Sequence, residues 1–319
     1  MKATRSIPGA AAWSAPLLLA LACAALLASC SSAPKRPPEV FEKRNQAADF
    51  VKLADSLVRQ GQYDSALKYY RQALDANSSV DALDGVSAAH SSLGRLWAAW
   101  GDLETAGREF GLAADYARLS GSGKAASLAA TGRGELAFRR GDAATALGFF
   151  DEALKAAGTD EGLRAIALHD RAGALYALGR AAEARTDLEA SSTLNTKLKR
   201  WSEIGANRYL LASFLVKEDK LPEALAAAEE ALLNDKKAEN SPGVANDLLL
   251  LADLSTRLGK QEEAWWYWRR AFDAALGANL APLARRAAAG LVAQAPLSGR
   301  DSELAYWKDA LGKLESLGK

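Results

Sequence analysis

The sequence predicts an all-α solenoid built from antiparallel helix pairs, and two observations predict it. First, one alanine-centred segment recurs through most of the 319-residue chain at a nearly constant spacing. Second, each copy places small, turn-forming and large apolar residues at the same distances from that alanine. The central alanines are Ala66, Ala106, Ala146, Ala184, Ala224 and Ala264, separated by 40, 40, 38, 40 and 40 residues. A period in this range is typical of repeat architectures whose units stack on their neighbours.

Each unit is predicted to form two helices joined by a tight turn. A small residue twelve positions before the central alanine lets the two helices approach closely. Five positions before the alanine stands a glycine, replaced once by Asp219, because the turn needs a residue that tolerates positive φ. Four positions after it, a large side chain fills the space between the helices, except at Ala228. The small residues are Ala54, Gly94, Gly134, Ala172, Ala212 and Ala252; the glycines are Gly61, Gly101, Gly141, Gly179 and Gly259; the large residues are Tyr70, Phe110, Phe150, Leu188 and Trp268.

This pattern resembles the tetratricopeptide repeat (TPR) over residues 47–276. A second alanine, seven positions after the central one, completes the resemblance, and only the fourth unit departs there, with Ser191. The usual repeat has about 34 residues, so these units have longer helices or linkers. The resemblance implies a TPR-type α-solenoid, a right-handed superhelix of antiparallel helix pairs whose first helices line a concave groove.

Residues 277–319 are expected to form a degenerate seventh repeat of capping helices. Pro282 suits the first turn of one helix. A final helix follows, with an apolar stripe formed by Leu304, Trp307, Leu311, Leu314 and Leu317. Such a pair would cover the open end of the sixth repeat, as terminal units of a solenoid must.

The N-terminus has the plan of a secretory signal peptide. Lys2 and Arg5 precede the apolar run "PLLLALACAALL", which is shorter than the about 20 residues that span a bilayer. The following "LASC" resembles the lipobox of bacterial lipoproteins, which implies removal of residues 1–29 and lipidation of Cys30, with palmitate among the acyl chains. Ser31 then favours the outer membrane by the same resemblance, and proline-rich residues 30–46 suit a tether. Ordinary cleavage and an uncleaved anchor remain the alternatives.

Composition excludes several classes of function. Lys and Arg number 40 against 39 Asp and Glu, and no basic block marks a nucleic-acid-binding arm. We therefore expect no nucleic-acid partner. Cys23 lies in the apolar run of the signal, and Cys30 is the expected lipid attachment site, so we expect no disulfide framework in the mature chain.

No motif predicts catalysis, a metal site or a cofactor. The segment "SGSGKAAS" lacks the first glycine of a phosphate-binding loop, where Arg118 stands, and has Ala125 where the loop needs Ser or Thr. Two histidines in different repeats cannot supply the three or four ligands of a zinc site. We expect a non-enzyme, with that segment serving as an inter-repeat linker.

The TPR resemblance assigns the partner-binding groove to positions on the first helices. They are Arg59, Arg95, Glu135, Phe138, Arg139, His169, Tyr176, Tyr209, Lys217, Asn246, Asp253 and Arg257. Four of them share one register position and could form a basic row for an acidic peptide or chain carboxylate: Arg59, Arg139, Lys217 and Arg257. The alternative is that these four are solvated charges at helix C-termini, where the helix dipole favours them.

The segment "AWWYWRRAF" concentrates aromatic residues in the sixth repeat. Register places Trp265 and Trp268 at core positions, opposite a neighbouring repeat rich in alanine, as large-on-small packing requires. Trp266 has no aromatic counterpart in other repeats. We expect it to be exposed or laid against the C-terminal cap, as a convex-face contact for a protein.

Together these features predict a non-catalytic, lipid-anchored TPR scaffold that binds protein or peptide partners in the bacterial cell envelope. We expect it at the outer membrane, facing the periplasm. An accessory protein of a periplasmic solute-binding or transport system, with an enclosed ligand pocket, is the alternative. An enzyme is the remote third possibility.

Overall fold

The computed structural model describes residues 41–316, of which residues 43–316 belong to one compact unit. The predicted signal peptide, the lipidated Cys30 and most of the tether lie outside the described residues. Among the described residues the first helix, α2, begins at Glu42, five residues before the repeat region expected from residue 47.

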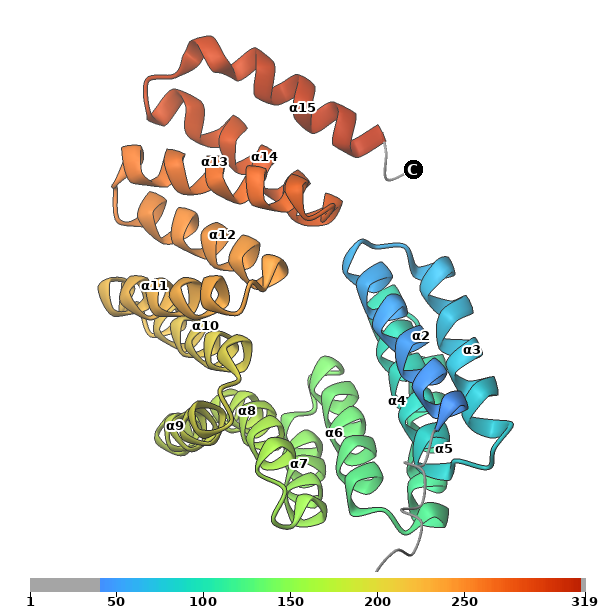
Figure 1. Ribbon diagram of the computed structural model, residues 1–319. Coiled ribbons are helices and arrows are strands. Elements are labelled where there is room, and N and C mark those ends of the chain that lie inside the picture. Colours follow the sequence, from blue (N-terminus) through green and yellow to red (C-terminus); the bar gives the residue numbers. More distant parts are fainter. Residues whose placement is uncertain (1–40, 317–319) are drawn as a thin grey trace, which may run out of the picture. The chain divides into compact units, whose positions relative to one another are not determined.

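The described residues form fourteen α-helices and one short 3-10 helix, with no strand among them (Figure 1). The first helices of the successive pairs are α2 (Glu42–Arg59), α4 (Leu83–Trp100), α6 (Gly123–Arg139), α8 (Glu161–Ala177), α10 (Trp201–Lys217), α12 (Ser241–Arg257) and α14 (Ala281–Leu297). The second helices are α3 (Tyr63–Ser78), α5 (Leu103–Ser120), α7 (Ala143–Ala157), α9 (Ala181–Lys197), α11 (Leu221–Lys237), α13 (Gln261–Gly277) and α15 (Leu304–Ser316), the last preceded by η1 (Asp301–Glu303).

From α4 to α12, each first helix packs against its own second helix and against the next first helix. Contacts join α4 to α6, α6 to α8, α8 to α10, α10 to α12 and α12 to α14. From α3 to α13, successive second helices lack comparable contacts with one another. The first helices therefore lie on the narrower side of the stack, the side on which the resemblance placed the groove.

The small residues are required by the rings that pack on them. A Cβ added to Gly94 would lie 2.7 Å from Cε1 of Phe110, and one added to Gly134 would lie 2.5 Å from Cε1 of Phe150. Both rings are almost fully buried. All six central alanines are 0% exposed, so the two helices of every repeat meet at the predicted position.

The turns inside the repeats adopt the left-handed conformation that the glycine pattern predicted. Gly61, Gly101, Gly141, Gly179 and Gly259 have φ between 74° and 98°. Asp219 adopts the same conformation, with φ of 59°. The backbone geometry is thus common to all six repeats, and only the fifth places a side chain there.

The last two helices cover the end of the sixth repeat. Trp307 on α15 is 0% exposed and meets the ring of Trp265 edge-on at 6.2 Å and that of Phe272 at 5.2 Å. Leu314 is also buried, and Leu317 lies outside the described residues. The sixth repeat therefore buries Trp265 and Phe272 against the last described helix, α15.

A contact also joins the two ends of this unit. Asn279, in the turn before α14, donates a hydrogen bond of 3.2 Å to the side-chain oxygen of Gln60, which follows α2. A Cβ added to Gly61 would lie 3.7 Å from Cγ of Pro282. Repeats far apart in the sequence are thereby brought together.

Candidate functional site: a polar groove on the first helices

A line of charged side chains runs along successive first helices. Asp55, Arg95 and Glu135 occupy the same register position on α2, α4 and α6. Nε and Nη2 of Arg95 donate to the two carboxylate oxygens of Glu135 at 2.9 and 3.1 Å, a bidentate ion pair. The hydroxyl of Tyr70 donates to Asp55 at 2.5 Å.

Asp170 on α8 continues this line as a carboxyl without a cation of its own. Removal from water raises its pKa, and the nearby negative charge of Glu135 raises it further, while Arg95 partly opposes both effects. The groove at α6 and α8 therefore favours the neutral acid at Asp170.

A pocket of about 290 Å³ opens beside this line of charges. Phe138, which is 41% exposed, and Arg139 form part of its wall. No hydrogen bond or ion pair within the described chain engages the guanidinium of Arg139. His169, Asp170 and Leu210 complete the far side of the pocket. An aromatic ring and a free cation therefore stand side by side at its rim.

A second pocket, of about 390 Å³, adjoins the first because both are lined by His169 and Leu210. Its other lining residues come from α10, α11, α12 and the turn before α12: Ser202, Ala206, Tyr209, Asp235, Asn240, Gly243, Asn246 and Asp247. The two pockets together extend along four successive first helices, α6, α8, α10 and α12.

The floor of the second pocket holds two buried carboxyl groups. Asp235 is 3% exposed and Asp247 is 1% exposed. Burial, together with the charge and hydrogen bond of Asp235, raises the pKa of Asp247 to about 8. Burial also raises the pKa of Asp235, although a hydrogen bond from Asn240 opposes that shift. At neutral pH the pair therefore retains a proton.

A polar network connects His169 to the interface between the fourth and fifth repeats. Nδ1 of His169 lies 2.7 Å from the side-chain oxygen of Asn207, whose Nδ2 donates to Ser191 and Ser192 at 3.0 Å. Burial lowers the pKa of His169, against the smaller opposing effect of Asn207. The neutral imidazole therefore donates from Nδ1 to Asn207.

Six of the predicted groove residues line the two pockets: Glu135, Phe138, Arg139, His169, Tyr209 and Asn246. Arg95 is engaged by Glu135. Tyr176 stacks on Phe214 at 3.9 Å and donates its hydroxyl to the carbonyl of that residue. Asp253 lies on α12 and lines neither pocket.

The predicted basic row consists of helix-terminal residues. Arg59, Arg139, Lys217 and Arg257 are the last residues of α2, α6, α10 and α12. Arg257 lies 3.5 Å from Asp219, and Lys217 lies 5.7 Å from the centre of the Tyr176 ring. This placement fits the helix-dipole alternative; only Arg139 also reaches a pocket.

Sequence reasoning missed three acidic groove residues, Asp170, Asp235 and Asp247. Asp247 was detectable, because its register position holds alanine in three of the six repeats. Asp235 was not, because it belongs to a second helix and reaches the pocket only through the close approach of α11 to α12. That approach is a tertiary property.

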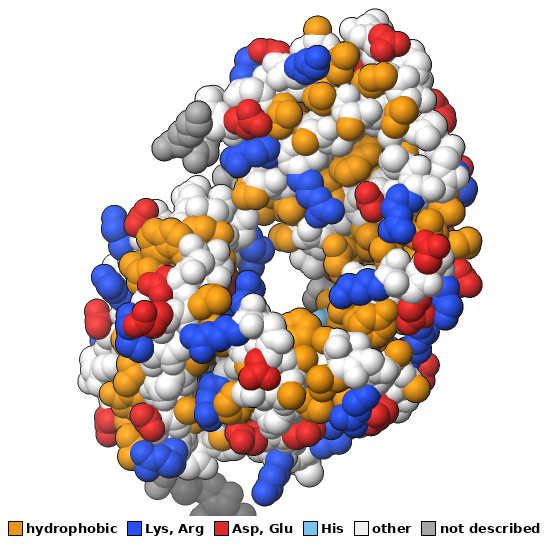
Figure 2. Space-filling model, turned by 180° about the vertical axis from the view of Figure 1, so that it is seen from behind, with side chains coloured by type: hydrophobic (Ala, Val, Ile, Leu, Met, Phe, Trp, Pro, Cys, Tyr) orange, Lys and Arg blue, Asp and Glu red, His pale blue; other side chains and the backbone are white. Residues whose placement is uncertain are grey.

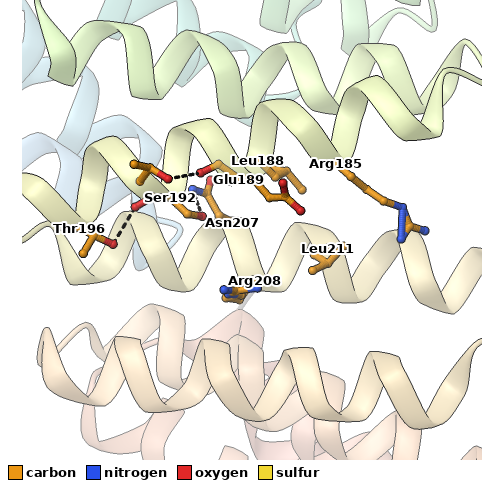
Figure 3. Close-up of a pocket in the computed structure, with 9 residues that line it drawn as sticks. Arg185, Leu188, Glu189, Ser192, Thr196, Asn207, Arg208 and Leu211 are labelled. Atoms are coloured by element: carbon orange, nitrogen blue, oxygen red, sulfur yellow. Dashed lines mark hydrogen bonds between the residues drawn. The ribbon is translucent and has the colours of Figure 1, made fainter.

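A further hollow, of about 500 Å³, lies between α9 of the fourth repeat and α10 of the fifth (Figure 3). Asn207 reaches from α10 toward Ser192 on α9 at one end, and Arg185 stands at the other. Arg208 is paired with Glu230 of α11 at 3.0 Å. Hydroxyl groups and already paired charges thus dominate this surface.

The tryptophan cluster divides as the repeat register predicted. Trp265 is 1% exposed, whereas Trp266 is 52% exposed. Arg300, in the turn after α14, lies 5.9 Å from the centre of the Trp266 ring. Trp268 is partly buried, and its ring occupies the space that a Cβ at Gly290 would need. The rings therefore do not line one cavity.

Other surface features are unremarkable in charge. Acidic and basic side chains are interspersed over the face seen in Figure 2.

Within residues 41–316, no group of three His, Cys, Asp or Glu residues could hold a metal ion. None of the described helices is long and apolar enough to cross a membrane. Ser122 of the "GSGK" segment caps α6 by accepting from the amide of Ala125.

Comparisons with known proteins identify the fold. No protein-family model and no curated protein matches the chain. A Rap protein in complex with Competence and Sporulation Factor has a similar structure, with a TM-score of 0.56 and 14% identity over 86% of this chain and 77% of that one. Aspartyl phosphate phosphatase F from Bacillus subtilis has a TM-score of 0.56 and 11% identity, over 89% and 77% of the two chains.

A third similar structure carries the repeat name itself. It is a signal-transduction ATPase with a tetratricopeptide repeat sensor, from Pyrococcus horikoshii, with a TM-score of 0.55 and 15% identity. The match covers 85% of this chain and 41% of the ATPase, so this chain spans less than half of that protein. These likenesses confirm the predicted fold, a TPR-like α-solenoid.

Proposed function

We propose that this protein is a non-catalytic scaffold that binds an extended segment of a partner protein in the groove of its first helices. The observation that carries the proposal is the continuity of the two pockets along α6, α8, α10 and α12. A run of four first helices suits an extended peptide, which contacts successive repeats in turn. A small solute would need one enclosed chamber.

The chemistry of the groove supports binding rather than catalysis. The strongest charges near it are engaged in ion pairs, as Arg95 is with Glu135. Phe138 and Arg139 remain available at the rim, and an exposed aromatic ring beside a free guanidinium is typical of a contact surface for proteins.

We also propose that a lipid on Cys30 tethers the scaffold to the cell envelope, at the outer membrane facing the periplasm. The lipobox resemblance and the proline-rich segment that follows it support this part of the proposal. On this view residues 47–276 form the six binding repeats and residues 277–319 form the cap.

A pull-down that compares two surfaces tests the proposal. The full-length chain, the groove variant Phe138→Ala/Arg139→Ala and the control Leu233→Ala are each used to capture proteins from detergent-solubilised envelopes. Leu233 is 69% exposed on the second helix α11, so its removal alters another surface. We expect a stoichiometric partner with the wild type and the control, and its loss with the groove variant.

Two results would contradict the proposal. One is capture of the same partner, in the same ratio, by the groove variant. The other is the absence of any stoichiometric protein partner under several extraction conditions. Matching thermal unfolding curves for the three chains ensure that loss of the partner reflects the groove and not the fold.

A further inference from the structure

The buried carboxyl pair of the second pocket occupies a site that the surrounding backbone is built to hold. A Cβ added to Gly243 on α12 would lie 2.3 Å from Oδ2 of Asp235. A Cβ added to Gly205 on α10 would lie 2.8 Å from Cγ of the same side chain. Two neighbouring helices therefore need glycine where they contact this carboxyl, because any other residue would displace it.

The polar interactions of the pair are incomplete. Oδ1 of Asp235 accepts a hydrogen bond of 2.8 Å from Nδ2 of Asn240. Oδ2 of Asp247 is buried and has no hydrogen-bond partner among protein donors. An acceptor left unpaired in a protein interior costs free energy comparable to that of a lost hydrogen bond.

No cation accompanies the pair within the described part of the chain, and this distinguishes it from other acids nearby. Asp187, whose side chain is 8% exposed, is paired with Arg171 at 2.7 Å. Glu135 is paired with Arg95. The carboxyl pair has no such partner among the described residues. Arg286 of α14 interacts with the hydroxyl of Tyr209 at the edge of the second pocket, and not with the two carboxyls. A buried acid without a counter-ion is the arrangement that a bound cation stabilises.

We propose that this pocket receives a primary ammonium group from the partner segment, with Asp235 and Asp247 as its counter-ions. The inference rests on the proposed function and names the chemistry of the bound segment. The ammonium replaces the proton that the pair retains, so one cation enters the pocket and one proton leaves to solvent. Ala206 and Leu210, which line the same pocket, offer apolar surface to a methylene stem.

The geometry favours an ammonium over a guanidinium. The oxygens come from two different carboxyls on α11 and α12, and Asn240 already occupies one of them. A guanidinium pairs best with both oxygens of one carboxylate, as Arg171 does with Asp187 at 2.7 and 2.9 Å. The three donors of an ammonium point in different directions, which suits acceptors on separate side chains.

Two amine probes distinguish the possible sources of the group. Nα-acetyl-lysinamide presents a lysine side chain with a blocked backbone, and leucinamide presents a free chain terminus. Each is titrated by calorimetry into the full-length wild type, the Asp247→Asn variant and the control Asp75→Asn. Asp75 is exposed on the second helix α3 and lines neither pocket.

We expect one of the probes to bind the wild type and the control equally, and Asp247→Asn to weaken that binding by about tenfold or more. At neutral pH, the binding enthalpy should change with the ionisation enthalpy of the buffer in the direction that indicates release of a proton on binding. The asparagine resembles the protonated carboxyl in size and charge, so the variant should fold as the wild type does, which thermal unfolding checks.

The proposal is overturned if neither probe binds at millimolar concentrations, or if Asp247→Asn binds as tightly as the wild type. Selective binding of Mg²⁺ or Ca²⁺ in place of both amines would also overturn it. None of these results affects the pull-down with the Phe138→Ala/Arg139→Ala variant. Failure of the amine site is therefore distinguishable from failure of the scaffold function.

Discussion

At the scale of the residue, three repeats share a hydrogen bond from a serine hydroxyl on one helix to a backbone carbonyl on the other. Ser87 on α4 donates to the carbonyl of Ala113 on α5 at 2.8 Å, and Ser127 donates to that of Ala153 at 3.0 Å. In the fourth repeat the hydroxyl stands on the second helix instead, and Ser191 donates to the carbonyl of Ala165 at 2.8 Å. Ser191, the residue that departs from the repeat pattern, therefore forms the same hydrogen bond, but the second helix donates it and the first helix accepts it.

The fit of Phe110 on Gly94 yields a prediction about packing. Gly94→Ala should lower the free energy of unfolding by about 1–3 kcal/mol, because the new methyl group overlaps the ring. Adding Phe110→Leu should restore part of the loss, since Ala172 and Leu188 form that pair in the fourth repeat. Urea unfolding measures both. Equal stability of Gly94→Ala and the wild type would show that the Phe110 ring can move to make room for the methyl group.

The carboxyl pair yields a prediction about pH. The pKa of Asp247 lies near 8 when folded, above its ordinary value of 3.8, so the folded chain holds a proton that the unfolded chain releases between these values. Stability therefore falls as pH rises through this window. Asp247→Asn removes this contribution. The melting temperature of the variant minus that of the wild type should therefore increase as the pH rises from 5 to 9. Besides Asp235, the charges of Glu203 and Tyr209 act on the pair.

Asp253→Asn, on the same helix, is the control for this experiment. Its melting temperature should follow that of the wild type over the whole range. A constant difference between Asp247→Asn and the wild type at every pH would show that Asp247 titrates normally.

At the scale of the element, the helix pairs are defined by their turns as much as by their packing. Every turn inside a repeat is left-handed, whether it holds glycine or Asp219. The turns between repeats show the same conformation at Asp81, Lys199, Glu239 and Asn279. The chain therefore tolerates strain between repeats that it mostly avoids within them.

Asp219→Gly should accordingly stabilise the protein by about 0.5–1 kcal/mol, because glycine adopts positive φ without steric cost. The contact of Asp219 with Arg257 is exposed at 3.5 Å and contributes little in opposition. The reciprocal change Gly179→Asp should destabilise the fourth repeat by a similar amount. Thermal unfolding of both variants checks this, and a loss of stability in Asp219→Gly would show that the ion pair dominates.

At the scale of the whole molecule, the stack brings polar side chains together where successive first helices converge. Asp55, Arg95 and Glu135 are forty residues apart in sequence, yet the charges of Asp55 and Glu135 both act on Arg95. The same stacking brings Asp235 of one repeat against Asp247 of the next. The polar residues of the groove therefore meet at interfaces between repeats and not within any single repeat.

The proposed lipid anchor gives a prediction for the full chain. When it is expressed in a bacterium with two membranes and fed labelled palmitate, the wild type should take up the label and Cys30→Ser should not. Cys23→Ser is the matched control and should remain labelled, because Cys23 lies in the apolar core of the signal. Retention of label by Cys30→Ser would refute lipidation at this position.

The sequence by itself determined the repeat, its register and the residues at each helix–helix contact. A solenoid repeats one local packing problem, so the same residue types recur at the same positions, as Ala66 and Gly61 do with their counterparts. It also separated buried Trp265 from exposed Trp266. Only the tertiary structure decided which polar residues meet. The pairing of Arg95 with Glu135, the carboxyl pair and the contact of Asn279 with Gln60 depend on the rotation between repeats. That rotation is set by the sum of many side-chain contacts, and no local pattern records it.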